Sequence, residues 1–237
     1  MNARVPPEYL LRTYRWAYLD RRWLRWLDRP VVVSAILWGN ARRLMARAIA
    51  TFRPGQRVLQ AAAVYGDFSQ RLLDRLGEGG HLDVVDVAPL QVANVRRKLR
   101  GRPNVSTRVA DLAVAAPGAY DGVCCFFLLH EVPPHVRGPI VDNLLRAVAP
   151  GGHVVFVDYH LPVRLHPLKA PMGWIFRHFE PFAESLTRQE IVELAAEPER
   201  FVWDKQVLFG GLYQIVTARA GLSKDSTDCH EFGQVLE

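Results

Sequence analysis

The chain has 237 residues, of which 49% are hydrophobic and 23% charged, so it is long enough to form one globular domain with a full core. Its net charge of +6 rests almost entirely on arginine, which favours an anionic partner unless it reflects composition bias of the genome. Three cysteines, two of them adjacent in an apolar run, exclude a disulfide framework and predict a reducing compartment. The apolar runs are far shorter than the ~20 residues of a membrane-spanning helix, and no signal-peptide pattern is visible.

Residues 1–52 differ in composition from the rest and are expected to form a helical, basic-aromatic extension. Arginines recur in it at three-, four- and seven-residue steps, which allows one basic helix face. Pro30 should end or kink this segment, and a second helix is expected over 31–50. Three interpretations stay open: an interfacial helix on an anionic membrane, a helix packed on the domain with snorkelling arginines, or a single-stranded nucleic-acid contact. No nucleic-acid motif accompanies the segment, so we expect no nucleic acid as partner.

After Pro54-Gly55 the pattern alternates between apolar strands and amphipathic helices. The predicted elements are strands at 57–62, 82–87, 105–109, 122–129 and 153–159, helices at 68–76, 90–99, 139–148 and 190–196, and a hairpin of 201–209 with 212–219. The last of these helices has capping-box spacing from Thr187 to Glu190. This order predicts an α/β fold: a doubly wound, mostly parallel seven-stranded sheet that ends in an antiparallel hairpin. Residues 53–220 would form that domain, and 221–237 a disordered tail.

The segment between the first strand and its helix has the position of a ligand-binding loop. Four alternate positions in it are occupied by Gln60, Ala62, Val64 and Gly66. Glycine lets a backbone approach a ligand closely, whereas valine is β-branched and rarely tolerates positive φ. We therefore expect a ligand at the carboxyl ends of the strands, held by a loop of unusual composition.

Two aspartates follow strands on the same edge of the predicted sheet. Asp86 lies about twenty residues beyond the loop, where dinucleotide-binding folds place a ribose-binding carboxylate; the alternative is a solvated loop residue. Asp111 follows the third strand and could read an adenine amino group, with Leu112 packing beside it, although a turn or cap aspartate fits nearly as well.

Imidazoles and carboxylates follow strands four and five, which are neighbours in this topology. His130 ends one strand, and Asp158 and His160 end the other on one face. Such a set suits a divalent metal such as Mn²⁺ or acid–base chemistry, while His130 as a packing residue is the alternative.

A long segment rich in histidine and aromatic residues follows strand five. An insertion there can cover an active site, and its rings suit a flat, apolar, ring-containing substrate; a satellite core under a long connection is equally compatible. Its members are His166, Trp174, Phe176, His178, Phe179 and Phe182.

Several stretches together resemble a known group of proteins. They are Val58–Phe68, Asp83–Asn94, Tyr120–Val132, Val154–His160 followed by His166–Lys169, and Phe209–Gln214. Over about residues 40–220 the chain resembles the class I S-adenosylmethionine (SAM) methyltransferases, and within them it is similar to the rhodoquinone biosynthesis enzymes. That family's usual loop begins with an acidic residue followed by glycines, so Gln60 and Val64 depart from it.

The resemblance implies that a ring methoxy group of ubiquinone is replaced by an amino group, with SAM as the nitrogen donor and Mn²⁺ assisting. It also implies a cytoplasmic enzyme on the face of a quinone-containing membrane. Tyr65 and His130 are the candidate catalytic residues, and Asp158, His160 and His130 the candidate metal ligands. The candidate cofactor-binding residues are Gln60, Ala62, Val64, Gly66, Asp67, Asp86, Val87, Asp111, Leu112 and Phe127.

Two other functions remain open at this point. A conventional SAM-dependent methyltransferase acting on a lipid-like quinol or phenol would fit the fold, but Gln60 and Val64 argue against it. A non-catalytic accessory protein of quinone biosynthesis would fit the altered loop, but the retained Asp86 and the residues around His130 argue against it.

Overall fold

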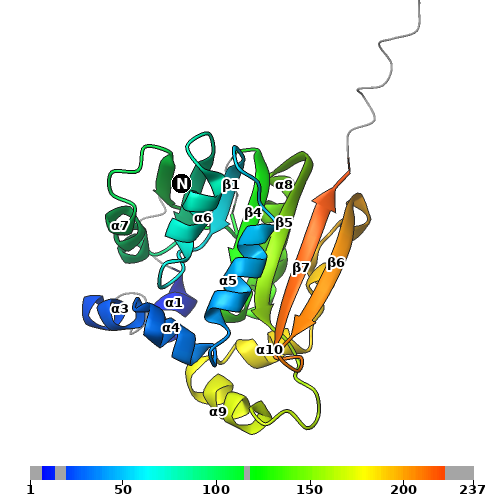
Figure 1. Ribbon diagram of the computed structural model, residues 1–237. Coiled ribbons are helices and arrows are strands. Elements are labelled where there is room, and N and C mark those ends of the chain that lie inside the picture. The colour runs from blue at the N-terminus through cyan, green and yellow to red at the C-terminus, as the bar shows by residue number, and fades with distance from the viewer. Residues whose placement is uncertain (1–6, 14–19, 115–117, 222–237) are drawn as a thin grey trace, which may run out of the picture.

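The computed structural model describes residues 7–13, 20–114 and 118–221, so the predicted tail lies outside the described part except for Gly221. A seven-stranded sheet has the order β3-β2-β1-β4-β5-β7-β6. Its strands are β1 (Arg57–Ala61), β2 (His81–Asp86), β3 (Val105–Val109), β4 (Tyr120–Phe126), β5 (Val148–Tyr159), β6 (Phe201–Leu208) and β7 (Tyr213–Ala220). The first five run parallel, and β7 pairs antiparallel with both β5 and β6. The predicted doubly wound fold with a terminal hairpin is confirmed (Figure 1).

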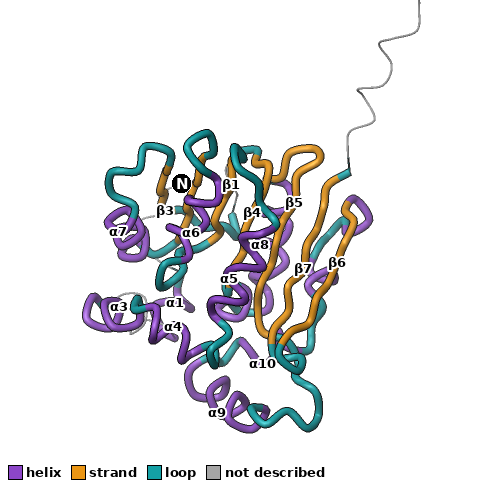
Figure 2. The backbone as a smooth tube through the Cα atoms, in the orientation of Figure 1, coloured by secondary structure: helices purple, strands orange, loops and turns teal. Residues whose placement is uncertain are grey.

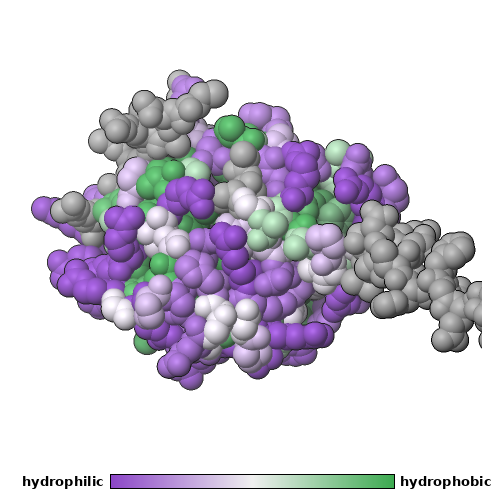
Figure 3. Space-filling model, turned by 90° about the horizontal axis from the view of Figure 1, so that it is seen from above, coloured by the Kyte–Doolittle hydropathy of each residue, from purple (hydrophilic) through white to green (hydrophobic). Residues whose placement is uncertain are grey.

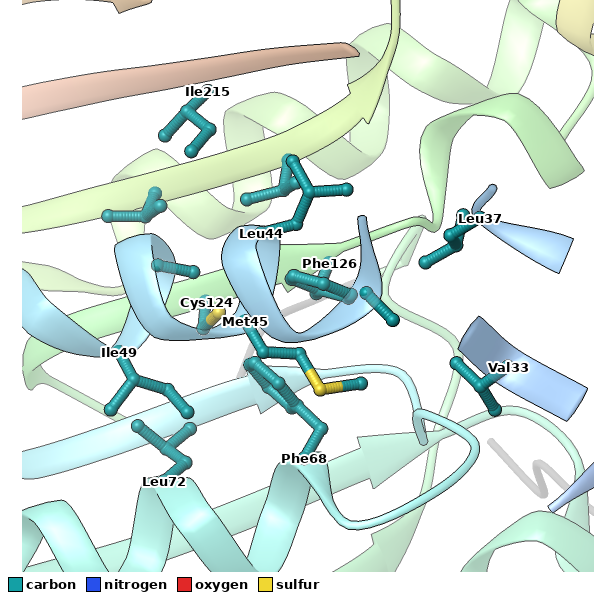
Figure 4. Close-up of a cluster of buried hydrophobic side chains, with 14 of the residues drawn as sticks. Val33, Leu37, Leu44, Met45, Ile49, Phe68, Leu72, Cys124, Phe126 and Ile215 are labelled. Carbon is teal, nitrogen blue, oxygen red and sulfur yellow. The ribbon is translucent and has the colours of Figure 1, made fainter. Parts of the chain in front are cut away.

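Helices cover both faces of the sheet, because the inner strands are apolar on both sides. One core lies between the sheet and α5 (Ala41–Ala50) with α6 (Phe68–Leu76). In Figure 4, Met45 of α5 lies beside Phe68 of α6, while Leu44 lies on the side of α5 nearer Ile215. The rings of Phe68 and Phe126 stack at 4.5 Å. The second core lies under α8 (Pro134–Arg146), on the other face. Figure 2 shows the strands as one layer between these helices.

The N-terminal extension departs from prediction in its second helix. It contains α1 (Glu8–Thr13), α3 (Arg21–Leu27) and α4 (Pro30–Ile36), followed by α5. Pro30 begins α4, because proline fits the first helical turn, where its missing N–H costs nothing. The helix predicted over 31–50 is two helices, since Trp38 and Gly39 adopt positive φ angles of 51° and 78° and reverse the chain between α4 and α5.

Several element boundaries around the later strands also differ from prediction. The fourth strand ends at Phe126 and is followed by a 3₁₀ turn, η1 (Leu129–Glu131), and α8 begins at Pro134. The residue that caps the turn η2 (Ile191–Leu194) is Glu190, paired with Glu193 in a capping box, so the predicted role of Thr187 as cap is wrong. The remaining elements are α7 (Pro89–Lys98), α9 (Lys169–Phe179), α10 (Ala183–Thr187) and η3 (Pro198–Arg200). None of the helices in the described ranges is long and apolar enough to cross a bilayer.

Candidate active site

The loop between β1 and α6, residues 62–67, is anchored at the carboxyl edge of the sheet by Asp86. One oxygen of this carboxylate accepts the Ala63 N–H at 2.7 Å, and the other accepts the Ala88 N–H at 2.7 Å. Burial raises the pKa of Asp86 to about 6, against the lowering effect of these two hydrogen bonds. Each oxygen keeps a second lone pair, so the carboxylate can still accept hydroxyl groups of a ligand.

A neutral amide stands at the start of this β1–α6 loop. Gln60 is fully buried, and its Nε2 donates to the Ala62 carbonyl oxygen at 2.9 Å, while its Oε1 has no hydrogen-bond partner among the described residues. Ala62 holds a φ of 72°, which costs energy for a residue with a Cβ. The Gln60 amide therefore binds the carbonyl oxygen of Ala62, the residue at which the chain turns. Because the amide is neutral, it brings no negative charge to the site.

The outer side of the β1–α6 loop is clamped by the N-terminal extension. The Gly66 N–H donates to Asp28 Oδ1 at 2.9 Å. Lys98 Nζ, from α7, donates to the same Asp28 oxygen at 2.7 Å and to the carbonyls of Gly66 at 2.8 Å and Val64 at 3.2 Å. Burial lowers the pKa of Lys98, and Asp28 opposes that shift. The Gly66 N–H is thus bound by the extension and the Val64 and Gly66 carbonyls by Lys98 of α7, so these groups are not offered to a ligand.

A cavity of about 50 Å³ lies on the inner side of the loop, under helix α1. Six of the predicted cofactor-binding residues line it: Ala62, Asp86, Val87, Asp111, Leu112 and Phe127. Tyr9 and Leu10 of α1 close it from above. Pockets for small molecules commonly measure about 300–1,000 Å³. A nucleoside-sized ligand can therefore enter only if α1 moves away.

The other four predicted cofactor-binding residues lie outside this cavity. Gln60, Val64 and Gly66 make the backbone contacts described above, and Asp67 forms an ion pair with Arg71 at 2.7 Å on the surface of α6. The six lining residues can therefore contact a ligand in the cavity directly, whereas the other four shape the loop.

His130 and Asp158 form a buried pair where β4 and β5 end. The distance from His130 Nδ1 to Asp158 Oδ1 is 2.8 Å, and the Leu129 N–H donates to the other carboxylate oxygen at 2.9 Å. Nε2 of the imidazole lies 3.9 Å from carboxylate oxygens of both Glu131 and Glu180. Burial alone would lower the pKa of His130, but the charge and hydrogen bond of Asp158, with Glu180 and Glu131, raise it to about 9. His130 is therefore protonated at neutral pH.

The third predicted metal ligand points elsewhere. The Nδ1 of His160 lies 3.0 Å from the Gly211 carbonyl oxygen, and its Nε2 lies 3.1 Å from Nζ of Lys205. His130 and Asp158 are thus brought together without His160. Within the described ranges no group of three or more His, Cys, Asp or Glu side chains is arranged to hold a metal ion.

Tyr65, the other predicted catalytic residue, lies in the interior beside α7. Its hydroxyl accepts a hydrogen bond from Gln91 Nε2 at 2.9 Å, and burial raises its pKa. A phenol with a raised pKa stays protonated and is a weaker acid, so in this position Tyr65 can donate a hydrogen bond but does not readily give up its proton.

Aromatic rings surround the imidazole of His130. Phe127, Tyr159 and Tyr213 form edge contacts or stacks with one another, and Phe127 and Tyr159 meet His130 at centroid distances of 5.7 and 4.8 Å. Phe176 of α9 packs on Tyr159 at 5.0 Å. The predicted aromatic insertion therefore contributes one ring to this wall, whereas its Trp174 and Phe179 are exposed.

Four residues that build the site were not among the predicted ones: Tyr9, Asp28, Lys98 and Glu180. Glu131, by contrast, adjoins His130 in the sequence and ends the turn η1. Asp28 and Lys98 show no local signal, because their contacts to Gly66 span 38 and 32 residues. Only the folded chain places them on the loop.

Comparison with known proteins defines the class of this domain. Residues 58–152 match the family model described as a methyltransferase domain. An O-methyltransferase family protein from Burkholderia thailandensis superposes with a TM-score of 0.65 over 89% of this chain and 63% of its own, at 15% identity. The N-methyltransferase NodS from Bradyrhizobium japonicum, solved with S-adenosyl-L-homocysteine, gives 0.56 over 90% and 99%, also at 15%. The described part of the chain therefore has the fold of these methyltransferases, and residues 58–152 are similar in sequence to a methyltransferase domain.

A weakly similar relative is an enzyme named for quinone biosynthesis. The ubiquinone/menaquinone biosynthesis C-methyltransferase UbiE of Yersinia pestis is 28% identical over 165 residues, which cover 67% of this chain. The match spans 64% of that relative, just under two thirds of its length.

Proposed function

We propose that the chain replaces a ring methoxy group of ubiquinone by an amino group, with SAM as co-substrate and nitrogen donor. The observation that carries this proposal is the buried Gln60, whose amide donates to Ala62 where the family's usual loop begins with an acidic residue. A carboxylate there would hold the α-ammonium group of SAM in its charged, non-nucleophilic form. A neutral amide leaves that nitrogen free to lose its proton and attack.

The site supplies groups for both ends of such a reaction. Asp86, Asp111 and the apolar residues of the cavity suit a nucleoside, in which Asp86 accepts ribose hydroxyls. The aromatic wall of Phe127, Tyr159 and Phe176 suits a quinone ring beside it. The protonated His130 can donate its Nε2 proton to the departing methoxide.

The atoms balance in two stages. The α-amino nitrogen forms a bond to the ring carbon, the carbon–oxygen bond to the methoxy group breaks, and methanol leaves with a proton. The nitrogen must then part from the donor. The quinone ring accepts two electrons from the α-carbon of the attached amino acid, which gives an imine. Water hydrolyses that imine to the aminoquinol and the 2-oxo acid derived from SAM.

We assign no step to a metal. The described residues offer the pair of His130 with Asp158, and His160 is directed toward Lys205, so the expected Mn²⁺ site is not formed by these three residues. Because the proposed substrate is a membrane lipid, we propose that the chain acts in the cytoplasm at the surface of a quinone-containing membrane.

A conventional methyltransferase acting on a quinol is the second candidate. The methyltransferase family match and the printed name of the UbiE relative favour it. Expression of the chain in a ubiquinone-producing host, followed by mass spectrometry of the extracted quinones, separates the two. We expect a quinone in which an amino group replaces methoxy; a product heavier by one methyl group, with S-adenosyl-L-homocysteine released, would support the second candidate and contradict the first.

A further inference from the structure

Exposed apolar side chains occur along α3, α4 and the turn that follows α4. Trp23 is 47% exposed, Trp26 49% and Val31 79%, and Ile36 and Trp38 are exposed as well. Large apolar groups in such a cluster on a soluble surface mark a place of contact with another molecule. We call Trp23, Trp26, Val31, Ile36 and Trp38 the outer apolar cluster.

The order of residues in α3 explains why its two tryptophans are exposed to solvent. Leu24 and Leu27 are buried against the domain, with exposed fractions of 5% and 6%. Trp23 and Trp26, one helical turn apart, lie on the flank of α3 beside this buried face, and their rings meet edge to face at 6.0 Å. About half of each tryptophan side chain is therefore open to solvent while the leucines hold the helix on the domain.

Arginines line a groove directly beside the two tryptophans. Arg22, Arg25 and Arg29 come from the extension and Arg97 from α7, and the indole of Trp26 forms part of the wall. The carboxylate in this groove is Asp28, whose oxygens accept from Gly66, Lys98 and Asn94, with Arg97 at 3.8 Å. Asp28 therefore offsets part of the charge of Lys98 and Arg97, and the groove remains positive overall.

The exposed aromatic surface continues from α4 to α9. The indole N–H of Trp38 donates to Met172 Sδ at 3.1 Å, which joins the two segments. Farther along α9, Trp174 is 53% exposed and Phe179 46%. Helices α3, α4 and α9 lie along the lower end in Figure 1, the end at which the parallel strands finish. The opposite end, seen in Figure 3, is mostly hydrophilic.

We propose that this end of the protein docks on an anionic phospholipid bilayer. The arginine groove takes a lipid phosphate, and the outer apolar cluster enters the interfacial layer, where tryptophan is favoured. Arginine matches phosphate by its planar, forked donors. Single-stranded nucleic acid would use the rings for stacking but leaves Val31 and Ile36 without a partner. A symmetric dimer through the same surface would bring the arginines of one copy against those of the other.

Vesicle sedimentation with the full chain tests this proposal. We expect binding to phosphatidylcholine vesicles that contain phosphatidylglycerol, weakening as salt rises, and little binding to phosphatidylcholine alone. The double variant Arg22→Glu/Arg25→Glu should bind at least about tenfold more weakly. Trp23→Gln/Trp26→Gln should also bind more weakly, to both kinds of vesicle. The matched control is Arg200→Glu/Arg219→Glu, which makes the same charge change at the opposite end of the sheet and should bind like the unaltered chain.

The outcomes separate this proposal from the others. Equal binding by the Arg22/Arg25 variant and the control would overturn the arginine groove as the lipid site. Tight binding to a single-stranded oligonucleotide with none to vesicles would favour nucleic acid, and a dimer by light scattering that fails to bind vesicles would favour a second copy; either result overturns the proposal. The vesicles contain no quinone, so the result does not depend on the proposed reaction.

Discussion

Asp28 and Lys98 form a buried ion pair, with 2.7 Å between Oδ1 and Nζ, that ties the N-terminal extension to the β1–α6 loop. Both side chains are less than one tenth exposed, and between them they bind the Gly66 N–H and the Val64 and Gly66 carbonyls. The extension is therefore part of the structure that shapes the site, and it positions the loop through polar contacts that a ligand would otherwise meet.

Removal of one partner from this pair should be costly. Asp28→Ala leaves the Lys98 ammonium buried without its counter-charge, and we expect the free energy of unfolding to fall by about 3 kcal/mol. Asp74→Ala, which breaks the exposed pair with Arg102, is the control and should cost less than about 1 kcal/mol. Urea unfolding measures both. An equal, small loss in the two variants would contradict the clamp.

The free energy of unfolding should depend on pH through the His130–Asp158 pair. The folded pKa of His130 is raised from 6.5 to about 9, so its stabilising contribution is complete below pH 6.5 and is lost as the pH rises through 9. We expect the chain to lose about 3 kcal/mol more than His130→Gln across this interval. Urea unfolding between pH 6 and pH 9.5 measures the difference, with the exposed His135→Gln as control. A stability advantage over His130→Gln that grows as the pH rises would have the opposite sign and contradict the prediction.

Helix α1 should slow the entry of SAM. Tyr9 closes the cavity beside Asp86, Asp111 and Glu131, whose charges, with burial, raise its pKa. A binding-competent state that is only partly populated lowers apparent affinity in proportion. Tyr9→Ala should therefore speed SAM association several-fold in stopped-flow experiments, whereas Leu11→Ala, on the exposed side of the same helix, should not. Slower association by the Tyr9 variant would mean that α1 helps to bind the ligand instead.

Asp86 should matter both for the loop and for the ligand. Asp86→Ala removes the acceptor of the Ala63 and Ala88 N–H groups together with the proposed ribose contact. We expect affinity for S-adenosyl-L-homocysteine to fall at least about tenfold, since hydrogen bonds to a charged group contribute about 1.5–3 kcal/mol each. Isothermal titration calorimetry measures the change, with Asp204→Ala on β6 as a control that should bind normally. Unchanged affinity would place the nucleoside elsewhere.

The sheet could be predicted because each of its strands has a recognisable local sequence pattern. The apolar run that includes Cys124 and Cys125 is covered on both faces, and Gly77 ends α6 before β2 begins. The positions of Asp86, His130 and Asp158 at one edge of the sheet could be predicted from the topology, because the ends of neighbouring parallel strands meet there.

The rest of the site depends on contacts that no local pattern encodes. Asp28 reaches Lys98 across 70 residues, and Tyr9 reaches the cavity only because α1 folds back over the strand ends. His160 was placed with Asp158 by strand alternation, but β5 ends at Tyr159 and the imidazole turns to Lys205. The alternation of side chains between the two faces of a sheet holds only within the strand itself.

The central claim is that the nitrogen of SAM, and not its methyl carbon, reaches the quinone. Incubation of the purified chain with ubiquinone and SAM that carries ¹⁵N in the α-amino group and ¹³C in the methyl group tests it directly by mass spectrometry. The account predicts a product that contains the ¹⁵N label and no ¹³C, with methanol released. A product that contains the ¹³C methyl group and no ¹⁵N would contradict it.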